Sequence, residues 1–237
     1  MTPPPTRRTM TPTTSSVAGA ARHVEDVAVG DEIVRHRLSS RLIHWTVAAA
    51  FAVALGTGLP IWTPLFGWLA FLFGGLTVCR WLHPLAGLLF FVAMGVMLVH
   101  WLSDMRLTPR DREWLRPARI ARYLRNEETD PDGGKYNGGQ KLFFFATVLG
   151  ALGLLVSGLV LWFPQTVSQP WRSAAILLHE AAFILFAVAI VLHVYLGTAA
   201  EPGTFRAMVR GTVTRAWARF HHPGWYREVV GDADHRP

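Results

Sequence analysis

The chain has 237 residues, of which 51% are hydrophobic and 16% charged, and its mean hydropathy is +0.27. This composition is typical of a membrane protein rather than a soluble domain. The single cysteine, Cys79, excludes an internal disulfide, an iron–sulfur cluster held by this chain alone and a CxxCH haem attachment. The basic residues, which give a net charge of +7, lie between apolar segments. No nucleic-acid-binding motif is present, so we interpret the charge as a signal of membrane topology.

The segments divide the chain into three predicted regions. Residues 1–34 begin with a stretch rich in Pro, Thr, Ser and Ala, which predicts a disordered N-terminal tail and not a cleaved signal peptide. Residues 35–200 are predicted to form a four-helix transmembrane domain with a basic cytoplasmic loop at 103–140. Residues 201–237 are predicted to be a basic amphipathic segment, helical over 204–220. The expected fold class is therefore an all-α membrane protein. Four segments are long enough to cross a hydrocarbon core of about 30 Å: 41–62, 81–102, 141–163 and 173–198.

A fifth apolar stretch, residues 64–79, is shorter and contains three glycines. Lys and Arg number six in residues 1–43, nine in 103–141 and six in 199–237. Four spans place all three basic segments on one side of the membrane, which the positive-inside rule makes cytoplasmic, whereas a fifth span would separate them. We therefore predict that 64–79 lies at the periplasmic face as a re-entrant or interfacial segment, and that both termini are cytoplasmic.

Four histidines, His44, His83, His179 and His193, lie near the ends of the apolar segments. Metal-binding or ionisable side chains inside a bilayer are costly and are functional candidates. The predicted topology places His44 and His193 at cytoplasmic depth, and His83 and His179 at periplasmic depth. The 14 residues between His179 and His193 correspond to about 21 Å of rise and about 40° of rotation, so one helix presents both rings to one side. This pattern predicts two stacked b-type haems with paired axial histidines, which transfer electrons.

Other interpretations fit each histidine alone. A single membrane histidine is often only a hydrogen-bond partner between helices, and a proton relay or a metal transporter is compatible with the spacing. The scarcity of carboxylates in the spans, where Glu180 is the clearest exception, argues against both. His100 lies at the same predicted depth as His44 and His193 and is therefore an alternative ligand at that level. We interpret it as an interfacial residue that extends to the headgroups. The remaining histidines lie in flanking or tail segments without a sensible ligand partner.

A set of short segments carries a resemblance to a known family over most of the chain, from about Arg35 to Val229. The segments are LIHWTV around His44, RWLHPLAG around His83, GKYNGGQK at 134–141, LLHEAAF around His179, VLHVYLG around His193 and WARFHHPGWYREV at 217–229. At these residues the chain resembles the cytochrome b556 (gamma) subunit of respiratory formate dehydrogenase. GKYNGGQK and the last segment are the most specific, whereas the histidine contexts would also suit cytochrome b subunits of membrane hydrogenases.

The resemblance implies a multi-pass protein of the bacterial inner membrane that holds two haem b groups and serves anaerobic respiration. It assigns His83 and His179 to the periplasmic haem, and His44 and His193 to the cytoplasmic haem. Electrons would arrive from an iron–sulfur beta subunit at the periplasmic face and pass to a quinone near the cytoplasmic haem, with protons taken from the cytoplasm. Formate oxidation itself would belong to an alpha subunit containing molybdenum or tungsten.

The resemblance also places the quinone site by the asparagine of the KYN motif, Asn137, and by His193, with Gln140 as a weaker candidate. Asn137 lies at the entry to the third span among glycines that allow close backbone approach to a ligand, and its amide can donate to a quinone carbonyl. A glycine-rich turn with an asparagine helix cap explains the same residues. Both explanations stay open from the sequence.

The sequence thus predicts the membrane dihaem cytochrome b subunit of a respiratory formate dehydrogenase, in contact with membrane lipid and with no nucleic acid. The equivalent subunit of a membrane hydrogenase or of another respiratory oxidoreductase is the alternative, and a haem-free membrane anchor is the second. Three features depart from the family pattern: the long N-terminal tail, the apolar character of 64–79, and His100.

Overall fold

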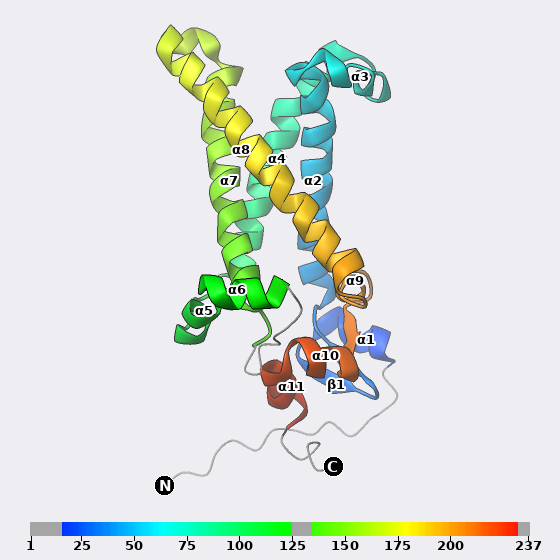
Figure 1. The fold of residues 1–237 in the computed structure, drawn as a ribbon. Helices are drawn as coiled ribbons and strands as arrows, with labels where there is room; N and C mark the ends of the chain where they lie inside the picture. The colour runs from blue at the N-terminus through cyan, green and yellow to red at the C-terminus, as the bar shows by residue number, and fades with distance from the viewer. Residues whose placement is uncertain (1–15, 125–133, 232–237) are drawn as a thin grey trace.

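A computed structural model of the chain describes residues 16–124 and 134–231. Four long helices form a bundle, with the described N- and C-terminal segments folded at one end and short connecting segments at the other, which we term the far end (Figure 1). Each is long and apolar enough to cross a membrane, which confirms the predicted four-helix membrane domain. They are α2 (Leu38–Trp62), α4 (Leu76–Trp101), α7 (Gly138–Trp162) and α8 (Gln169–Tyr195), the last extended by the π-helical turn η3 (Leu196–Ala200).

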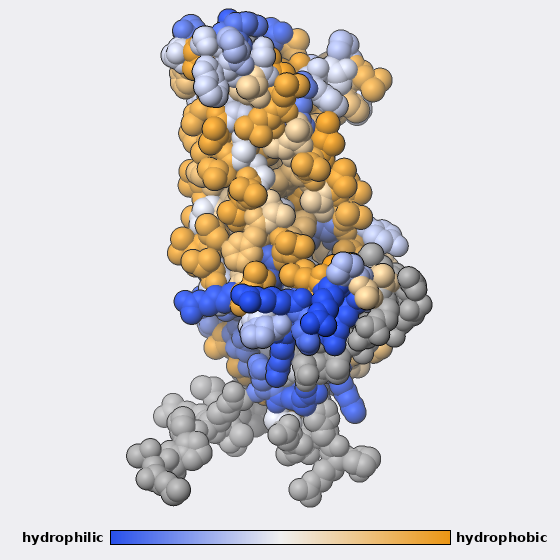
Figure 2. Space-filling view, turned by 60° about the vertical axis from the view of Figure 1, so that its left-hand side comes forward, coloured by the Kyte–Doolittle hydropathy of each residue, from blue (hydrophilic) through white to orange (hydrophobic). Residues whose placement is uncertain are grey.

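Within the bundle, α2 packs along α4, α7 packs along α8, and α4 contacts α7. Helix α8 crosses the bundle obliquely (Figure 1). Small residues in the interior, such as Ala50, Ala93 and Ala151, are buried and allow this close packing. Figure 2 shows hydrophobic residues over the middle of the bundle and hydrophilic residues gathered at its two ends. Helices that are apolar on their outer face as well are those expected of membrane spans.

The stretch 64–79 connects α2 to α4 at the far end and does not span, as predicted. It forms a 3-10 turn, η1 (Pro64–Phe66), and a single helical turn, α3 (Leu69–Leu72), while its last four residues begin α4. Gly74 and Gly75 reverse the chain with φ of 90° and 110°, which side chains disfavour. The side chain of Phe71 is 87% exposed. Exposed aromatic side chains at this depth are typical of a segment in the membrane interface.

The N-terminal tail predicted over 1–34 is wrong for residues 16–34; residues 1–15 of that prediction lie outside the described residues. The described part forms α1 (Val17–His23) and a hairpin of β1 (Val27–Val29) and β2 (Glu32–Val34). Strand β3 (Thr212–Thr214) pairs antiparallel with β2, so Ile33 lies opposite Val213. The all-α prediction therefore holds for the bundle but missed a small three-stranded sheet, of order β1-β2-β3.

The single helix predicted over 204–220 is also wrong. The chain forms α9 (Phe205–Val209), β3, α10 (Arg215–His221) and α11 (Pro223–Val230). Gly211 breaks the helix with φ of 85°, and a Cβ there would lie 2.4 Å from the carbonyl oxygen of His36. The sheet and these helices enclose a small hydrophobic core that includes Ile33, Trp217 and Trp225. We call residues 16–36 and 201–231 the polar cap.

Between α4 and α7, the described part of the predicted basic loop forms α5 (Pro109–Trp114) and α6 (Pro117–Leu124). A capping box of Thr108 and Asp111 begins α5. Asp111 Oδ2 also accepts a hydrogen bond of 2.8 Å from Lys141 Nζ in the first turn of α7, and both side chains are buried. This ion pair fixes α5 against the start of α7.

We predict that Asp111→Asn destabilises the protein, because it leaves the Lys141 ammonium group buried without its counter-charge. Breaking a buried ion pair costs about 3 kcal/mol. Burial raises the pKa of Asp111, but hydrogen bonds from Lys141 and Thr108 outweigh burial and lower the pKa below its usual value. The carboxylate is therefore ionised at neutral pH, and its contribution is lost only as the pH falls through this lowered pKa.

Thermal unfolding in detergent at neutral pH measures this effect as a lower midpoint. Asp104→Asn, which changes an exposed carboxylate nearby, is the matched control and should shift the midpoint little. Equal shifts for the two variants would contradict a special role for the Asp111–Lys141 pair.

Candidate functional site

Helix α8 carries two histidines, and each meets one histidine of another helix. The ring centroid of His193 lies 6.1 Å from that of His44 on α2, and the ring centroid of His179 lies 6.1 Å from that of His83 on α4. The structure therefore brings the four histidines together in the two predicted pairs. We call His44 and His193 the cap pair, and His83 and His179 the far pair. An ion held between two imidazoles would put the ring centres about 6 Å apart, from about 2 Å for each metal–nitrogen bond and about 1 Å from nitrogen to ring centre.

Hydrogen bonds fix the tautomers of the far pair. His83 Nδ1 lies 2.9 Å from the carbonyl oxygen of Ala54, which only accepts, so Nδ1 carries the proton. His179 Nδ1 lies 2.9 Å from Ser157 Oγ, and that hydroxyl donates its own proton to the carbonyl oxygen of Gly153 at 2.6 Å. His179 Nδ1 must therefore donate to Ser157. Both rings keep Nε2 as an unprotonated nitrogen, and metal-binding histidines are commonly oriented through the opposite N–H in this way.

Glycines bring helix backbone close to the rings of the far pair. A Cβ added to Gly58 of α2 would lie 2.8 Å from Cε1 of His83, and one added to Gly158 of α7 would lie 3.4 Å from Cε1 of His179. The first distance is shorter than any ordinary carbon contact. A side chain at Gly58 would therefore displace the ring of His83.

The cap pair is surrounded by aromatic side chains. Phe143 of α7 stacks on His193 with ring centroids 4.8 Å apart and planes 6° apart, and Trp45 meets His44 edge-on at 5.2 Å. Trp45 in turn donates from Nε1 to the carbonyl oxygen of Met208 in the polar cap, at 3.0 Å. Nδ1 of His44 is buried, with no hydrogen-bond partner among the described residues. A buried polar atom of this kind is one that a bound group would be expected to satisfy.

Each histidine pair offers two facing imidazoles. In the described ranges, 16–124 and 134–231, no group of three or more His, Cys, Asp or Glu side chains is placed to hold a metal ion. A structural zinc site takes four protein ligands, and a catalytic one takes three. Haem brings its own equatorial nitrogens and needs the protein only at the axial positions. The two pairs therefore fit haem better than a bare metal ion.

Asn137 and Gln140 form the capping box that begins α7. Asn137 Oδ1 accepts from the backbone N–H of Gln140 at 2.9 Å, and Gln140 Oε1 accepts from the backbone N–H of Asn137 at 3.1 Å. Gly138 and Gly139, which follow Asn137, leave room for Trp114 of α5 to pack against the start of α7. A Cβ at Gly139 would lie 2.6 Å from Cη2 of Trp114. The helix-cap explanation of this motif is thus realised. The box uses the oxygen of each side-chain amide and leaves each NH₂ group outside it.

Comparison with known proteins agrees with this geometry. The prokaryotic cytochrome b561 family matches residues 35–211. The cytochrome b556(fdo) subunit of formate dehydrogenase from Escherichia coli K12 is 37% identical over 202 residues, which cover 84% of this chain and 94% of the relative. The corresponding cytochrome b556 subunit from Haemophilus influenzae is 35% identical over 86% of this chain and 87% of its own length. The nitrate-inducible cytochrome b556(Fdn) subunit of E. coli K12 is 35% identical over 83% of this chain and 91% of its own length.

The chain belongs to the formate dehydrogenase cytochrome b556 subunits. The resemblance inferred from the sequence is thereby confirmed. As a member of this family the chain is a multi-pass membrane protein with haem b as its cofactor, and it is an electron-transfer subunit of an oxidoreductase complex.

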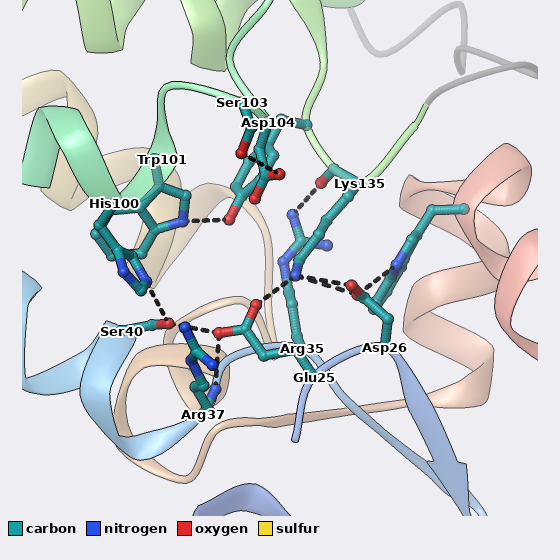
Figure 3. Close-up of polar contacts among 12 residues, drawn as sticks. Glu25, Asp26, Arg35, Arg37, Ser40, His100, Trp101, Ser103, Asp104 and Lys135 are labelled. Carbon is teal, nitrogen blue, oxygen red and sulfur yellow. Dashed lines mark hydrogen bonds and ion pairs between the residues drawn. The ribbon is translucent and has the colours of Figure 1, made fainter. Parts of the chain in front are cut away.

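In this cytochrome b subunit, His100 belongs to neither histidine pair. Its Nε2 lies 2.9 Å from Ser40 Oγ, and the Ser40 hydroxyl donates to the carboxylate of Glu25 (Figure 3). The interpretation of His100 as a side chain that extends only to the headgroups is therefore incomplete. Through Ser40 and Glu25, His100 connects the last turn of α4 to the first turn of α2 and to the polar cap. It also lines an open apolar groove on α2 and α4.

Aromatic side chains fill the bundle between the two pairs. Phe186 lies seven residues from each histidine of α8. Its ring centroid is 4.9 Å from that of Phe51 and 5.5 Å from that of Phe90. These rings are part of a hydrophobic cluster that packs the interior between the pairs.

Several polar-cap residues that the sequence did not indicate contact the residues before α7. His222 is buried, and its Nδ1 lies 2.8 Å from the carbonyl oxygen of Gly134. Burial and the nearby Arg35 guanidinium hold the pKa of His222 well below its usual value, so the ring is neutral at pH 7. His36, which had no expected partner, is buried and stacks on Tyr136 with ring centroids 6.2 Å apart. The sequence feature that could have indicated these residues is the distinctive segment at 217–229, which contains His222.

We predict that Gly58→Val lowers the haem b content of the purified protein, because the new side chain occupies the position of the His83 ring. Gly95→Val is the matched control, since a Cβ at Gly95 meets no atom within 4 Å and Gly95 lies on the open groove of α4, twelve residues from His83. A pyridine haemochrome assay per mole of chain measures the difference. Unchanged haem content in Gly58→Val would show that the position of His83 does not matter for haem binding.

Proposed function

We propose that the chain is the dihaem cytochrome b subunit of a respiratory formate dehydrogenase, and that the far pair and the cap pair are the axial ligands of two haems. The observation that carries this proposal is the geometry of α8, which contributes one histidine to each pair, with the same 6.1 Å centroid separation in both. Two imidazole ligands leave no open iron position. Each haem would therefore supply one-electron transfer and not oxygen binding.

The membrane orientation follows from charge. The polar cap and the described part of the 103–140 loop lie at one end of the bundle (Figure 1). The positive-inside rule makes this end cytoplasmic and the far end periplasmic, in a bacterial inner membrane. The far pair then lies on the periplasmic side and the cap pair on the cytoplasmic side. About 21 Å of helix rise separates the two histidines of α8, so together the pairs bridge most of the hydrocarbon core.

The partners follow from the same orientation. An iron–sulfur beta subunit would deliver electrons at the far end, and an alpha subunit containing molybdenum or tungsten would oxidise formate. The names of the relatives favour this complex over a hydrogenase. Purification of the intact complex, followed by metal analysis, tests this: molybdenum or tungsten supports it, whereas nickel contradicts it.

A quinone is the proposed electron acceptor at the cap end, near Asn137 and His193, with Gln140 beside them. The NH₂ group of Asn137 lies outside the capping box and is a donor suited to a quinone carbonyl. Quinone reduction takes two electrons and two protons. The protons come from the cytoplasmic side in this arrangement.

We predict that the wild-type chain binds two haems and that His179→Ala loses one of them, because the periplasmic haem then lacks an axial ligand. The remaining haem should keep a native reduced-minus-oxidised spectrum. His100→Gln is the control and should retain both haems. Two haems with native spectra in His179→Ala would refute the pairing, and loss of a haem in His100→Gln would make His100 a ligand.

We predict that Asn137→Asp slows reoxidation of the haems by quinone about tenfold, which equals about 1.4 kcal/mol. Aspartate keeps an oxygen that can cap α7 but removes the NH₂ donor. Reduction of the haems by formate should remain at the wild-type rate. Stopped-flow spectroscopy of the haem bands measures both steps, and wild-type quinone turnover would remove Asn137 from the site.

A further inference from the structure

The residues that lead into α7 are held by contacts from several distant parts of the chain. We call residues 134–137 the KYN segment. His222, at the start of α11, contacts the carbonyl oxygen of Gly134 at 2.8 Å. The side chain of Lys135 forms ion pairs of 2.8 Å with Glu25 and 3.1 Å with Asp26, both from the polar cap (Figure 3). The hydroxyl of Tyr136 accepts a hydrogen bond of 2.8 Å from Trp101 Nε1, in the last turn of α4.

Arg35 lies at the centre of these contacts and is 4% exposed. Its Nη2 donates to the carbonyl oxygen of Lys135 at 2.5 Å. Its guanidinium carbon lies 5.6 Å from the ring centre of Tyr136, and 5.1 Å from the ring centres of both Trp217 and Trp225. At these distances the cation is attracted to the faces of all three rings. One side chain thus connects the KYN segment to both helices at the C-terminal end of the polar cap.

The backbone of Arg35 is itself anchored. Its N–H donates to the carbonyl oxygen of Gly211 at 2.8 Å, where the chain enters β3. Arg35 also follows β2 directly. The main chain of Arg35 is bound to Gly211 and its guanidinium group to Lys135. Arg35 therefore fixes the position of the KYN segment relative to the bundle. Asn137 is only two residues beyond the carbonyl that Arg35 binds.

We propose that Arg35 is a positioning residue of the quinone site, which holds the KYN segment so that the NH₂ group of Asn137 meets the quinone. This inference rests on the proposed role of Asn137. It makes the polar cap, built from both ends of the chain, a part of the quinone site and not only a solvent-facing cover. Misplacement of a donor by about 1 Å is enough to lose much of its effect.

The test uses the intact formate dehydrogenase complex and a short-chain quinone analogue. Arg35→Lys keeps the charge but loses the planar fork and the stacking, and Arg35→Met loses the charge as well. Both variants should raise KM for the quinone analogue about tenfold, with a smaller change in kcat. The haem content and the rate of haem reduction by formate should stay at wild-type values. Wild-type KM in Arg35→Lys would overturn the proposal, because charge alone would then suffice.

Arg206→Met is the matched control. Arg206 forms an ion pair with Glu32 within the polar cap and lies outside the contacts described above for the KYN segment, so this variant should keep the wild-type KM. If the Arg35 variants fail to assemble, His222→Phe provides the second route. It removes the contact to the Gly134 carbonyl, and it should raise KM in the same direction by a smaller factor. An unchanged KM in assembled His222→Phe would count against the proposal.

A double variant separates the positioning role of Arg35 from the quinone-binding role of Asn137. If Arg35 acts through Asn137, Arg35→Lys combined with Asn137→Asp should resemble Asn137→Asp alone. Additive effects would show that Arg35 acts independently and would overturn the positioning role. If Asn137→Asp by itself leaves quinone turnover unchanged, the proposed quinone site fails, and this result is distinct from a failure of Arg35.

Discussion

The bundle depends on one constraint: each imidazole in the apolar interior needs a partner for its ring nitrogens and room for its ring. At the far pair, a backbone carbonyl and a serine hydroxyl provide the partners, and two glycines provide the room. These contacts also draw helices together, because His83 reaches from α4 to α2 and His179 reaches from α8 to α7. The same interactions that pack the helices therefore orient the proposed haem ligands, so stability and cofactor binding are difficult to separate here.

The interior between the two pairs is packed with aromatic side chains. The rings of Phe51, Phe90 and Phe186 occupy the level between the pairs. Glu180 is the one carboxylate within the four spans, and it lies beside His179 at the far end. A proton path through the bundle would need a chain of polar groups across this level. Under the proposed function, electrons would cross this level between the haems, and protons for quinone reduction would be taken from the cap end.

The polar cap depends on pairing between segments from opposite ends of the chain. Strand β2 leads into α2, and β3 follows α9, yet the two strands are neighbours in one sheet. The KYN segment lies where this cap meets the bundle. Its contacts with Arg35 and His222 are buried, so they are shielded from solvent and hold the entry to α7 firmly. The proposed quinone site is in this way supported by residues that are far from it in sequence.

The sequence by itself determined the four spans, the non-spanning stretch and the histidine pairs, because hydropathy sets membrane segments and helical rise sets depth. It also carried the family resemblance that the relatives confirm. The tertiary structure decided what depends on contacts between distant segments: the folded polar cap in place of a tail, the β-strand within the expected C-terminal helix, and the roles of Arg35, Ser40 and His222. Short strands of three residues have little pattern of their own, and their pairing partners here lie at opposite ends of the chain. Local sequence records the preference of each segment, but only the folded chain shows which distant segments meet.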